Sequence, residues 1–90
     1  MTAFLVWGPE QGERIEDAVT VTERDAEDAA IYWGETQDFD SADDAIARGE
    51  SYPLVCVVER ETPGAAPKWY RVTGEYIPTY YADEEEEPKP

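Results

Sequence analysis

The sequence lacks both histidine and asparagine, and it contains a single cysteine. Without histidine there is no imidazole for acid–base catalysis or metal ligation, and without asparagine there is no N-glycosylation site. One cysteine forms neither an internal disulfide nor a zinc site built from several thiolates. The fold therefore has to stand without cross-links, which suits a reducing cytoplasm.

Basic residues are scarce, and no apolar run approaches the length of a membrane span. Lys and Arg number 7 against 22 Asp and Glu, so the formal net charge is −15. A membrane span needs about 20 apolar residues, whereas the apolar stretch 3–7 is short and lacks the basic flank of a signal peptide. An acidic surface also repels nucleic acid and anionic lipid, so we expect neither as a direct partner.

Enough apolar material is present for a folded domain. Hydrophobic residues make up 41% of the 90 residues and aromatic residues 12%, in contrast to the low hydrophobicity typical of disorder. A chain of this length forms one domain. We assign residues 1–82 to a single α+β domain and residues 83–90, which are mostly glutamate and proline, to a disordered acidic tail.

The apolar pattern predicts an α+β fold with the order ββαββ. Strands are expected where aromatic and β-branched residues gather between glycine and proline stops, at 3–7, 18–22, 54–58 and 68–73. The segment 54–58 is apolar throughout, which is typical of a strand covered on both faces. Residues 76–81 are extended, with Pro78 restricting them to an edge. We therefore predict an antiparallel sheet of about four strands with one main helix on one face.

The main helix is expected between the second and third strands. An apolar stripe occupies positions i, i+3, i+4 and i+7, namely Ala26, Ala29, Ala30 and Trp33. Thr22 is the expected N-cap, with Asp25 three residues later in a capping-box arrangement. Gly34 is expected to begin the end of the helix.

The segment 35–52 leaves two alternatives, a short second helix that starts near Ser41 and is closed by Gly49, or a structured acidic loop. The stretch 38–49 opens with D-x-D as a calcium-binding loop does. It carries alanine, aspartate and glycine at the fifth, sixth and twelfth positions, where that loop needs a ligand, a glycine and a glutamate. We therefore predict no metal site and no cofactor.

Few side chains are candidates for catalysis. Cys56 lies in the most apolar segment and has no histidine to activate it, so we interpret it as a small buried hydrophobe. Ser41 and Ser51 lack a G-x-S-x-G context, and the scattered glycines form no phosphate-binding loop. We predict no catalytic residue and no enzymatic activity.

Surplus negative charge is the strongest functional signal. A net charge of −15 exceeds the roughly 2–8 units that suffice for the solubility of a small domain. Carboxylates three or four residues apart on a helix are about 5–6 Å apart, the same order as phosphates along a DNA strand. A rigid acidic surface is therefore suited to a cationic site built for nucleic acid.

In size, charge and single-domain build, the whole chain resembles small acidic phage inhibitors of host defence. These are the anti-restriction and anti-CRISPR proteins, several of which mimic DNA. The resemblance implies a cytoplasmic location in a bacterial host cell. It also implies a partner, a cationic nucleic-acid-binding protein or complex such as a Cas effector. The expected partner-binding residues are acidic side chains of residues 23–44 and two tyrosines: Glu23, Glu27, Asp28, Glu35, Asp38, Asp40, Asp43, Asp44, Tyr80 and Tyr81.

A second hypothesis assigns the charge to solubility alone. The chain would then be a phage or bacterial interaction module that binds through an exposed sheet edge and its Tyr-rich C-terminal segment, since tyrosine is favoured as an interface anchor. An uncovered edge strand also pairs with a second copy, so the sequence leaves the oligomeric state open.

Overall fold

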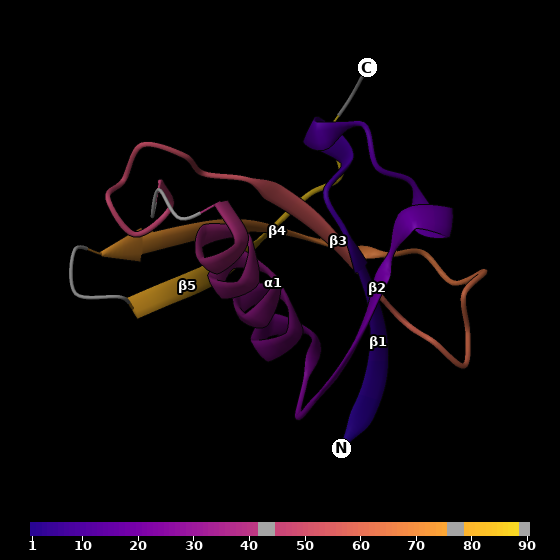
Figure 1. Cartoon of the computed structure of the whole chain (residues 1–90). Helices are drawn as coiled ribbons and strands as arrows, with labels where there is room; N and C mark the ends of the chain where they lie inside the picture. The colour runs from indigo at the N-terminus through magenta and orange to yellow at the C-terminus, as the bar shows by residue number, and fades with distance from the viewer. Residues whose placement is uncertain (42–44, 76–78, 89–90) are drawn as a thin grey trace.

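A computed structural model describes residues 1–41, 45–75 and 79–88, and within them it has an α+β fold (Figure 1). Five strands form one antiparallel sheet in the order β2-β1-β3-β4-β5, and one main helix accompanies it. The elements have these bounds: β1 Thr2–Trp7, β2 Val19–Glu23, α1 Ala26–Ser41, β3 Leu54–Glu59, β4 Lys68–Glu75 and β5 Thr79–Glu85. Two 3-10 turns, η1 (Pro9–Gln11) and η2 (Ile15–Asp17), lie between β1 and β2.

The structure confirms the α+β class and the main helix but corrects the predicted ββαββ order to ββαβββ. The additional strand is β5, which pairs with β4 and runs to Glu85, three residues beyond the predicted end of the domain at residue 82. Strand pairing uses backbone hydrogen bonds, so an acidic segment can extend a sheet without apolar side chains. Residues 76–78, including Pro78, lie outside the described residues.

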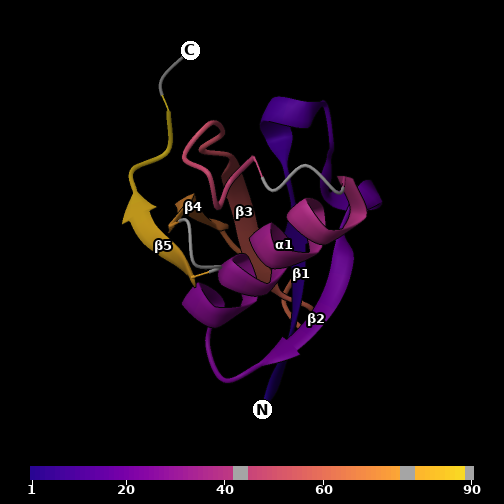
Figure 2. The same cartoon turned by 60° about the vertical axis from the view of Figure 1, so that its left-hand side comes forward.

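Strand β3 is central, as its apolar sequence predicts. It lies between β1 and β4, and five of its six residues are buried. The connection from β2 to β3 passes through α1, which lies across one face of the sheet (Figure 2) and contacts every strand of it. One side of α1 therefore covers this face of the sheet, and the other side of the helix is exposed to solvent.

The two faces of the sheet have separate apolar clusters. On the α1 side, the larger core includes Phe4, Val6, Val21, Ala29, Ala30, Trp33, Val55, Val57, Tyr70 and Val72. On the opposite face, a smaller cluster contains Trp7, Cys56 and Val58, with Leu5, Ile15, Ala18 and Trp69 packed against it. The alanines and Trp33 of the predicted helical stripe thus lie in the core, because that stripe is the side of α1 that faces the sheet.

Both predicted ends of α1 are wrong. The N-cap is Asp25, whose Oδ1 accepts the backbone N–H of Asp28 at 2.9 Å, whereas Thr22 belongs to β2. At the other end the helix continues past Gly34 to Ser41. A Cβ at Gly34 would lie 2.7 Å from Cγ1 of Val72, so this glycine allows α1 to approach β4 closely instead of ending the helix.

The described part of the segment after α1 is a turn and contains no second helix. Residues 42–44 lie outside the described residues, and 45–49 form consecutive turns. Gly49 adopts the left-handed φ of +74°, and the N–H of Glu50 donates to the carbonyl of Ala45 at 2.8 Å. Gly49 thus closes the turn, because a residue without Cβ tolerates that backbone conformation.

Replacing Gly74 with alanine should lower the free energy of unfolding by about 2 kcal/mol, the typical cost of overpacking. A Cβ at this position of β4 would lie 2.8 Å from the carbonyl oxygen of Ile46 and 2.9 Å from Cα of Ala47. Urea denaturation measures the change. Gly64→Ala is the matched control, because nothing lies within 4 Å of its added Cβ. Equal stability of the two variants would contradict the close approach.

Candidate partner-binding surface

Helix α1 lies against one face of the sheet (Figure 2), and acidic and aromatic side chains are among its exposed residues. The Asp25 cap fixes where the helix starts, and the buried alanine row fixes which side turns inward. The acidic and aromatic side chains left exposed or half-exposed define what we call the α1 outer face: Glu27, Asp28, Tyr32, Glu35, Phe39 and Asp40. Asp28, Tyr32, Glu35 and Phe39 form a row along the helix, and Glu27 and Asp40 flank this row on either side. Four of the ten predicted partner-binding residues, Glu27, Asp28, Glu35 and Asp40, are therefore exposed or half-exposed on this helix.

Most of the negative charge on the α1 outer face is not neutralised. Arg24 pairs with Asp28 at 2.9 Å, and more distantly with Asp25 at 3.8 Å. Among the described residues, Glu27, Glu35 and Asp40 take part in no ion pair. Exposed ion pairs contribute little to stability, so this face is a local source of negative potential with one compensating cation at its start.

Asp38, although predicted to bind a partner, is 2% exposed and directed into the protein. Its Oδ1 accepts the backbone N–H of Ile46 at 3.0 Å, and its Oδ2 accepts the N–H of Ala47 at 2.9 Å. The hydroxyl of Tyr80 also donates to Oδ2, at 2.8 Å. Asp38 and Tyr80 therefore connect the last turn of α1 to the 45–47 turn and to β5, and neither contributes to an exposed acidic surface.

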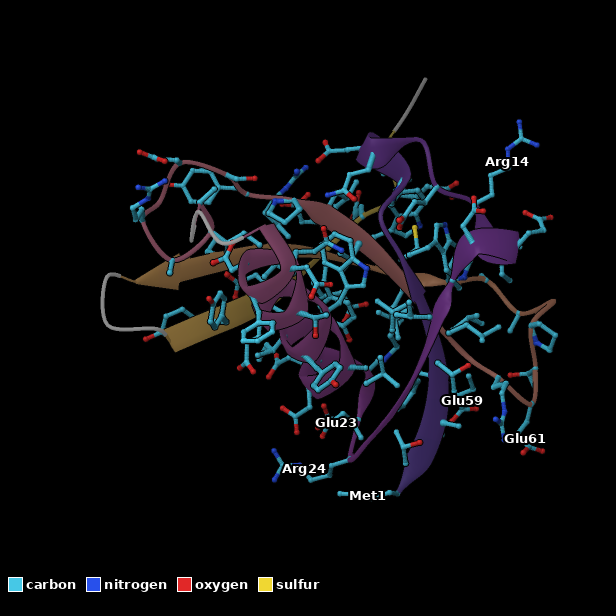
Figure 3. The ribbon with its side chains drawn as sticks, in the orientation of Figure 1. Met1, Arg14, Glu23, Arg24, Glu59 and Glu61 are labelled. Carbon is cyan, nitrogen blue, oxygen red and sulfur yellow. The ribbon has the colours of Figure 1, made fainter. Side chains whose placement is uncertain are left out.

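The remaining predicted residues are elsewhere. Glu23 ends β2 and lies beside Arg24 at the end of the molecule that holds Met1 (Figure 3). Tyr81 is 44% exposed, and because Ala82 faces the α1-side core, Tyr81 points to the opposite face of the sheet. Asp43 and Asp44 lie outside the described residues.

On the face of the sheet opposite α1, acidic side chains are tied to Arg71. Its Nη1 donates to Glu10 Oε1 at 3.1 Å and to the carbonyl of Tyr52 at 2.9 Å, and its Nε donates to Glu85 at 3.3 Å. Burial by itself would lower the pKa of Arg71, but the hydrogen bonds to Glu85 and Glu10 outweigh it and raise the pKa. These two carboxylates therefore have a structural role, unlike those of the α1 outer face.

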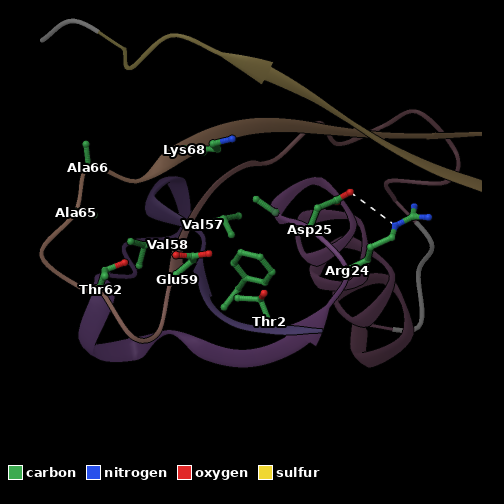
Figure 4. A pocket seen from close by; sticks show the side chains of 12 residues that line it. Thr2, Arg24, Asp25, Val57, Val58, Glu59, Thr62, Ala65, Ala66 and Lys68 are labelled. Atoms are coloured by element: carbon green, nitrogen blue, oxygen red, sulfur yellow. Dashed lines mark ion pairs between the residues drawn. The ribbon is translucent and has the colours of Figure 1, made fainter.

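A pocket of about 360 Å³ opens beside the N-terminal end of α1 (Figure 4). Phe4, Val57 and Ala26 give it an apolar lining, and Glu59 and Lys68 place one charge of each sign at its wall. The Arg24–Asp25 ion pair also borders it. Because its charges balance, this pocket differs from the acidic α1 outer face and is not a site for a strongly cationic group.

Cys56 is buried at 1% exposure, as expected for a structural cysteine. Burial raises the pKa of its thiol from 9.0 to about 12, and the negative charge of Glu87 adds to the rise. At neutral pH the group is therefore a protonated thiol, whereas the thiolate is the nucleophilic form. We assign Cys56 to the packing of the second apolar cluster.

The Cys56 thiol should make the fold less stable at alkaline pH. Its contribution is complete below its unfolded pKa of 9.0 and is lost as pH rises toward about 12, by roughly 1 kcal/mol for each pH unit. Urea denaturation between about pH 8 and 10 measures this decline, because burial also raises the pKa of Tyr70 and its contribution is lost only from its ordinary pKa of 10.0 upward. The Cys56→Val variant should lose the decline, and an unchanged slope would contradict the assignment.

The aromatic members of the α1 outer face, Tyr32 and Phe39, were not predicted as site residues. A signal for them exists in the sequence, because together with Asp28 and Glu35 they fall at i, i+4, i+7 and i+11, the spacing of one helix face. That row runs opposite the alanine stripe. Because the alanine stripe is predicted to face the core, this row is expected to face the solvent.

No protein-family model matches the chain, and no curated protein or solved structure matches it either. Among the described residues, no cluster of His, Cys, Asp or Glu is arranged to hold a metal ion. Helix α1 is neither long nor apolar enough to cross a membrane, and the same is true of any other described helix. We therefore infer function from the charge, burial and spacing of the side chains themselves.

Proposed function

We propose that this protein is a non-enzymatic inhibitor whose α1 outer face binds a cationic nucleic-acid-binding site of another protein. The partner is a host defence complex that handles nucleic acid, such as a Cas effector. The observation that carries the proposal is the set of exposed carboxylates without ion pairs along one helix, Glu27, Glu35 and Asp40. Cationic channels that accept a nucleic-acid backbone are general features of such effectors.

The position of Asp40 supports a use for this charge outside folding. It lies in the last turn of α1, where the helix dipole disfavours negative charge, and that turn contains no basic residue. Asp38 in the same turn is explained by its internal hydrogen bonds, but Asp40 is exposed. A side chain that weakens its own helix and pairs with no cation in the described part of the chain is consistent with selection for binding.

The length of helix over which these carboxylates extend also fits a nucleic-acid site. From Glu27 to Asp40 the helix axis rises about 20 Å, at about 1.5 Å for each residue. One DNA strand rises the same distance over about six nucleotides. The carboxylates are held on a helix whose inner side is buried, so little conformational entropy is lost when a partner binds them.

Binding to a purified Cas surveillance complex across a salt series tests the proposal. If carboxylates replace phosphates, affinity should fall at least about tenfold between about 50 and about 200 mM salt, and duplex DNA should compete. A restriction endonuclease and a protein without a nucleic-acid site serve as comparisons. Binding that is insensitive to both salt and DNA would overturn the proposal.

A second candidate function uses the far edge of the sheet. Strand β5 is an edge strand, and Tyr81 on it is exposed on the face opposite α1. If the protein binds its partner through this edge, Tyr81→Ala should weaken the complex more than charge reversal at Glu35 does. Tyr81 is the more informative position than Tyr80, because removing the Tyr80 hydroxyl also disturbs the Asp38 contacts.

A further inference from the structure

Two aromatic side chains on the α1 outer face are exposed to solvent. Phe39 is 84% exposed and Tyr32 is 49% exposed. The aromatic residue that anchors the helix to the sheet is Trp33, which is 3% exposed. Tyr32 and Phe39 therefore do not contribute large burial to the fold, and a polar helix former such as glutamine would fit the same positions with less apolar surface in water.

These aromatics and the acids alternate along one line of the helix. Asp28, Tyr32, Glu35 and Phe39 follow each other at spacings of four, three and four residues, so neighbours lie about 5–6 Å apart. Tyr32 and Phe39 are seven residues apart, which is about two turns and about 10 Å along the axis. The surface thus presents two apolar groups, each flanked by a carboxylate.

We propose that Tyr32 and Phe39 are anchors that insert into apolar pockets of a partner protein, while Lys and Arg around those pockets meet Asp28, Glu35 and Asp40. This inference rests on the proposed function and names the chemistry of the partner surface. Buried aromatic anchors surrounded by polar contacts are the arrangement in which few residues supply most of the binding energy. The alternating row is the helix-in-groove mode of recognition, read at i, i+4, i+7 and i+11.

Charge decides among the occupants of this face. A second copy of the chain would place carboxylates against carboxylates, and like charges across an interface are unfavourable. Nucleic acid and anionic lipid are repelled for the same reason. A protein surface that combines positive charge with apolar pockets complements both kinds of side chain. Positive charge alone satisfies only the carboxylates and leaves the two aromatics in water.

Two synthetic helical peptides of equal charge separate the aromatic contribution from the charge contribution. One is built from lysine and leucine, with the leucines on one side, and the other has glutamine in place of each leucine. Each is titrated into the full-length protein labelled with ¹⁵N. The lysine–leucine peptide should bind about tenfold more tightly and shift the resonances of Tyr32 and Phe39.

The Phe39→Ala variant should lose about tenfold in affinity for the lysine–leucine peptide and keep its affinity for the lysine–glutamine peptide. Tyr52→Ala is the matched control, because Tyr52 is an exposed aromatic outside α1, and it should change neither affinity. Phe39 is exposed, so its removal should leave the urea midpoint unchanged. If the urea midpoint does shift, the ratio of the two peptide affinities is compared within each variant, because a change in the folded fraction affects both affinities equally.

The outcomes distinguish this inference from the proposed function. Equal affinity for both peptides, with strong salt dependence, would overturn the anchor role and leave the charge-based proposal standing. Resonance shifts confined to β5 and Tyr81 would also overturn it, and would favour the sheet-edge module. Failure of both peptides to bind at low salt would overturn the proposed function itself.

Discussion

Replacing Asp38 with alanine should lower the free energy of unfolding by about 3–5 kcal/mol. The substitution removes the acceptor of two buried backbone N–H groups, those of Ile46 and Ala47, and of the Tyr80 hydroxyl. Each buried donor left without an acceptor costs about 1–3 kcal/mol. Because small domains are stable by only about 5–15 kcal/mol, this is a large share of the total.

Urea denaturation of three further variants tests this cost. Tyr80→Phe removes one donor and should cost about 1 kcal/mol, while Asp38→Asn keeps one acceptor oxygen and should be intermediate. Asp40→Ala is the matched control, since it removes an exposed aspartate two residues away and should change stability by less than about 0.5 kcal/mol. If Asp38→Ala and Asp40→Ala were equally mild, the internal role of Asp38 would be contradicted.

The strands and the inner side of the helix could be predicted from sequence because their signals are local. The segment 54–58 is apolar at every position, and the structure places it at the centre of the sheet. Ala29, Ala30 and Trp33 repeat with the period of a helix and are buried. In each case a short window of sequence contains the whole physical cause.

The ends of the helix and the acidic continuation of the last strand, beyond the extended segment predicted at 76–81, could not be predicted, because their causes are distant in sequence. Gly34 looks like a helix terminator until Val72 is seen 2.7 Å from where its Cβ would be. Glu84 and Glu85 look like a disordered tail until they pair with Tyr70 and Trp69 of β4. Neither neighbour lies within the window that the local pattern covers.

The acidic character of the candidate site could be predicted from the sequence, but the residues that belong to it could not. Counting carboxylates treats Asp38 and Asp40 as equal, although one is buried and hydrogen-bonded and the other is exposed. A hint was present, because Asp38 continues the row of Ala30 and Gly34 at intervals of four, the row that faces the sheet. A charged residue in a buried row has to be paired, which is what the structure shows.

Reversing the charge of two acids in the C-terminal half of α1 should stabilise the fold and abolish most of the binding. In the double variant Glu35→Lys and Asp40→Lys, the helix dipole gains a cation in the last turn at position 40, and repulsion among the carboxylates falls at both positions. Each charge contributes about 0.3–1 kcal/mol. We expect the free energy of unfolding to rise by about 1 kcal/mol, and affinity for the lysine–leucine peptide to fall about a hundredfold at low salt.

Glu27→Lys is the control that separates the two effects, because Glu27 lies in the first turn of the same helix. There the dipole favours negative charge, so this reversal should lower stability by about 0.5 kcal/mol and also weaken peptide binding. If these charges serve binding, reversing them should raise stability in the double variant and lower it in Glu27→Lys. Affinity for the peptide should fall in both. If stability and affinity fell together in the double variant, these acids would belong to the fold, and the surplus charge on α1 would need another explanation.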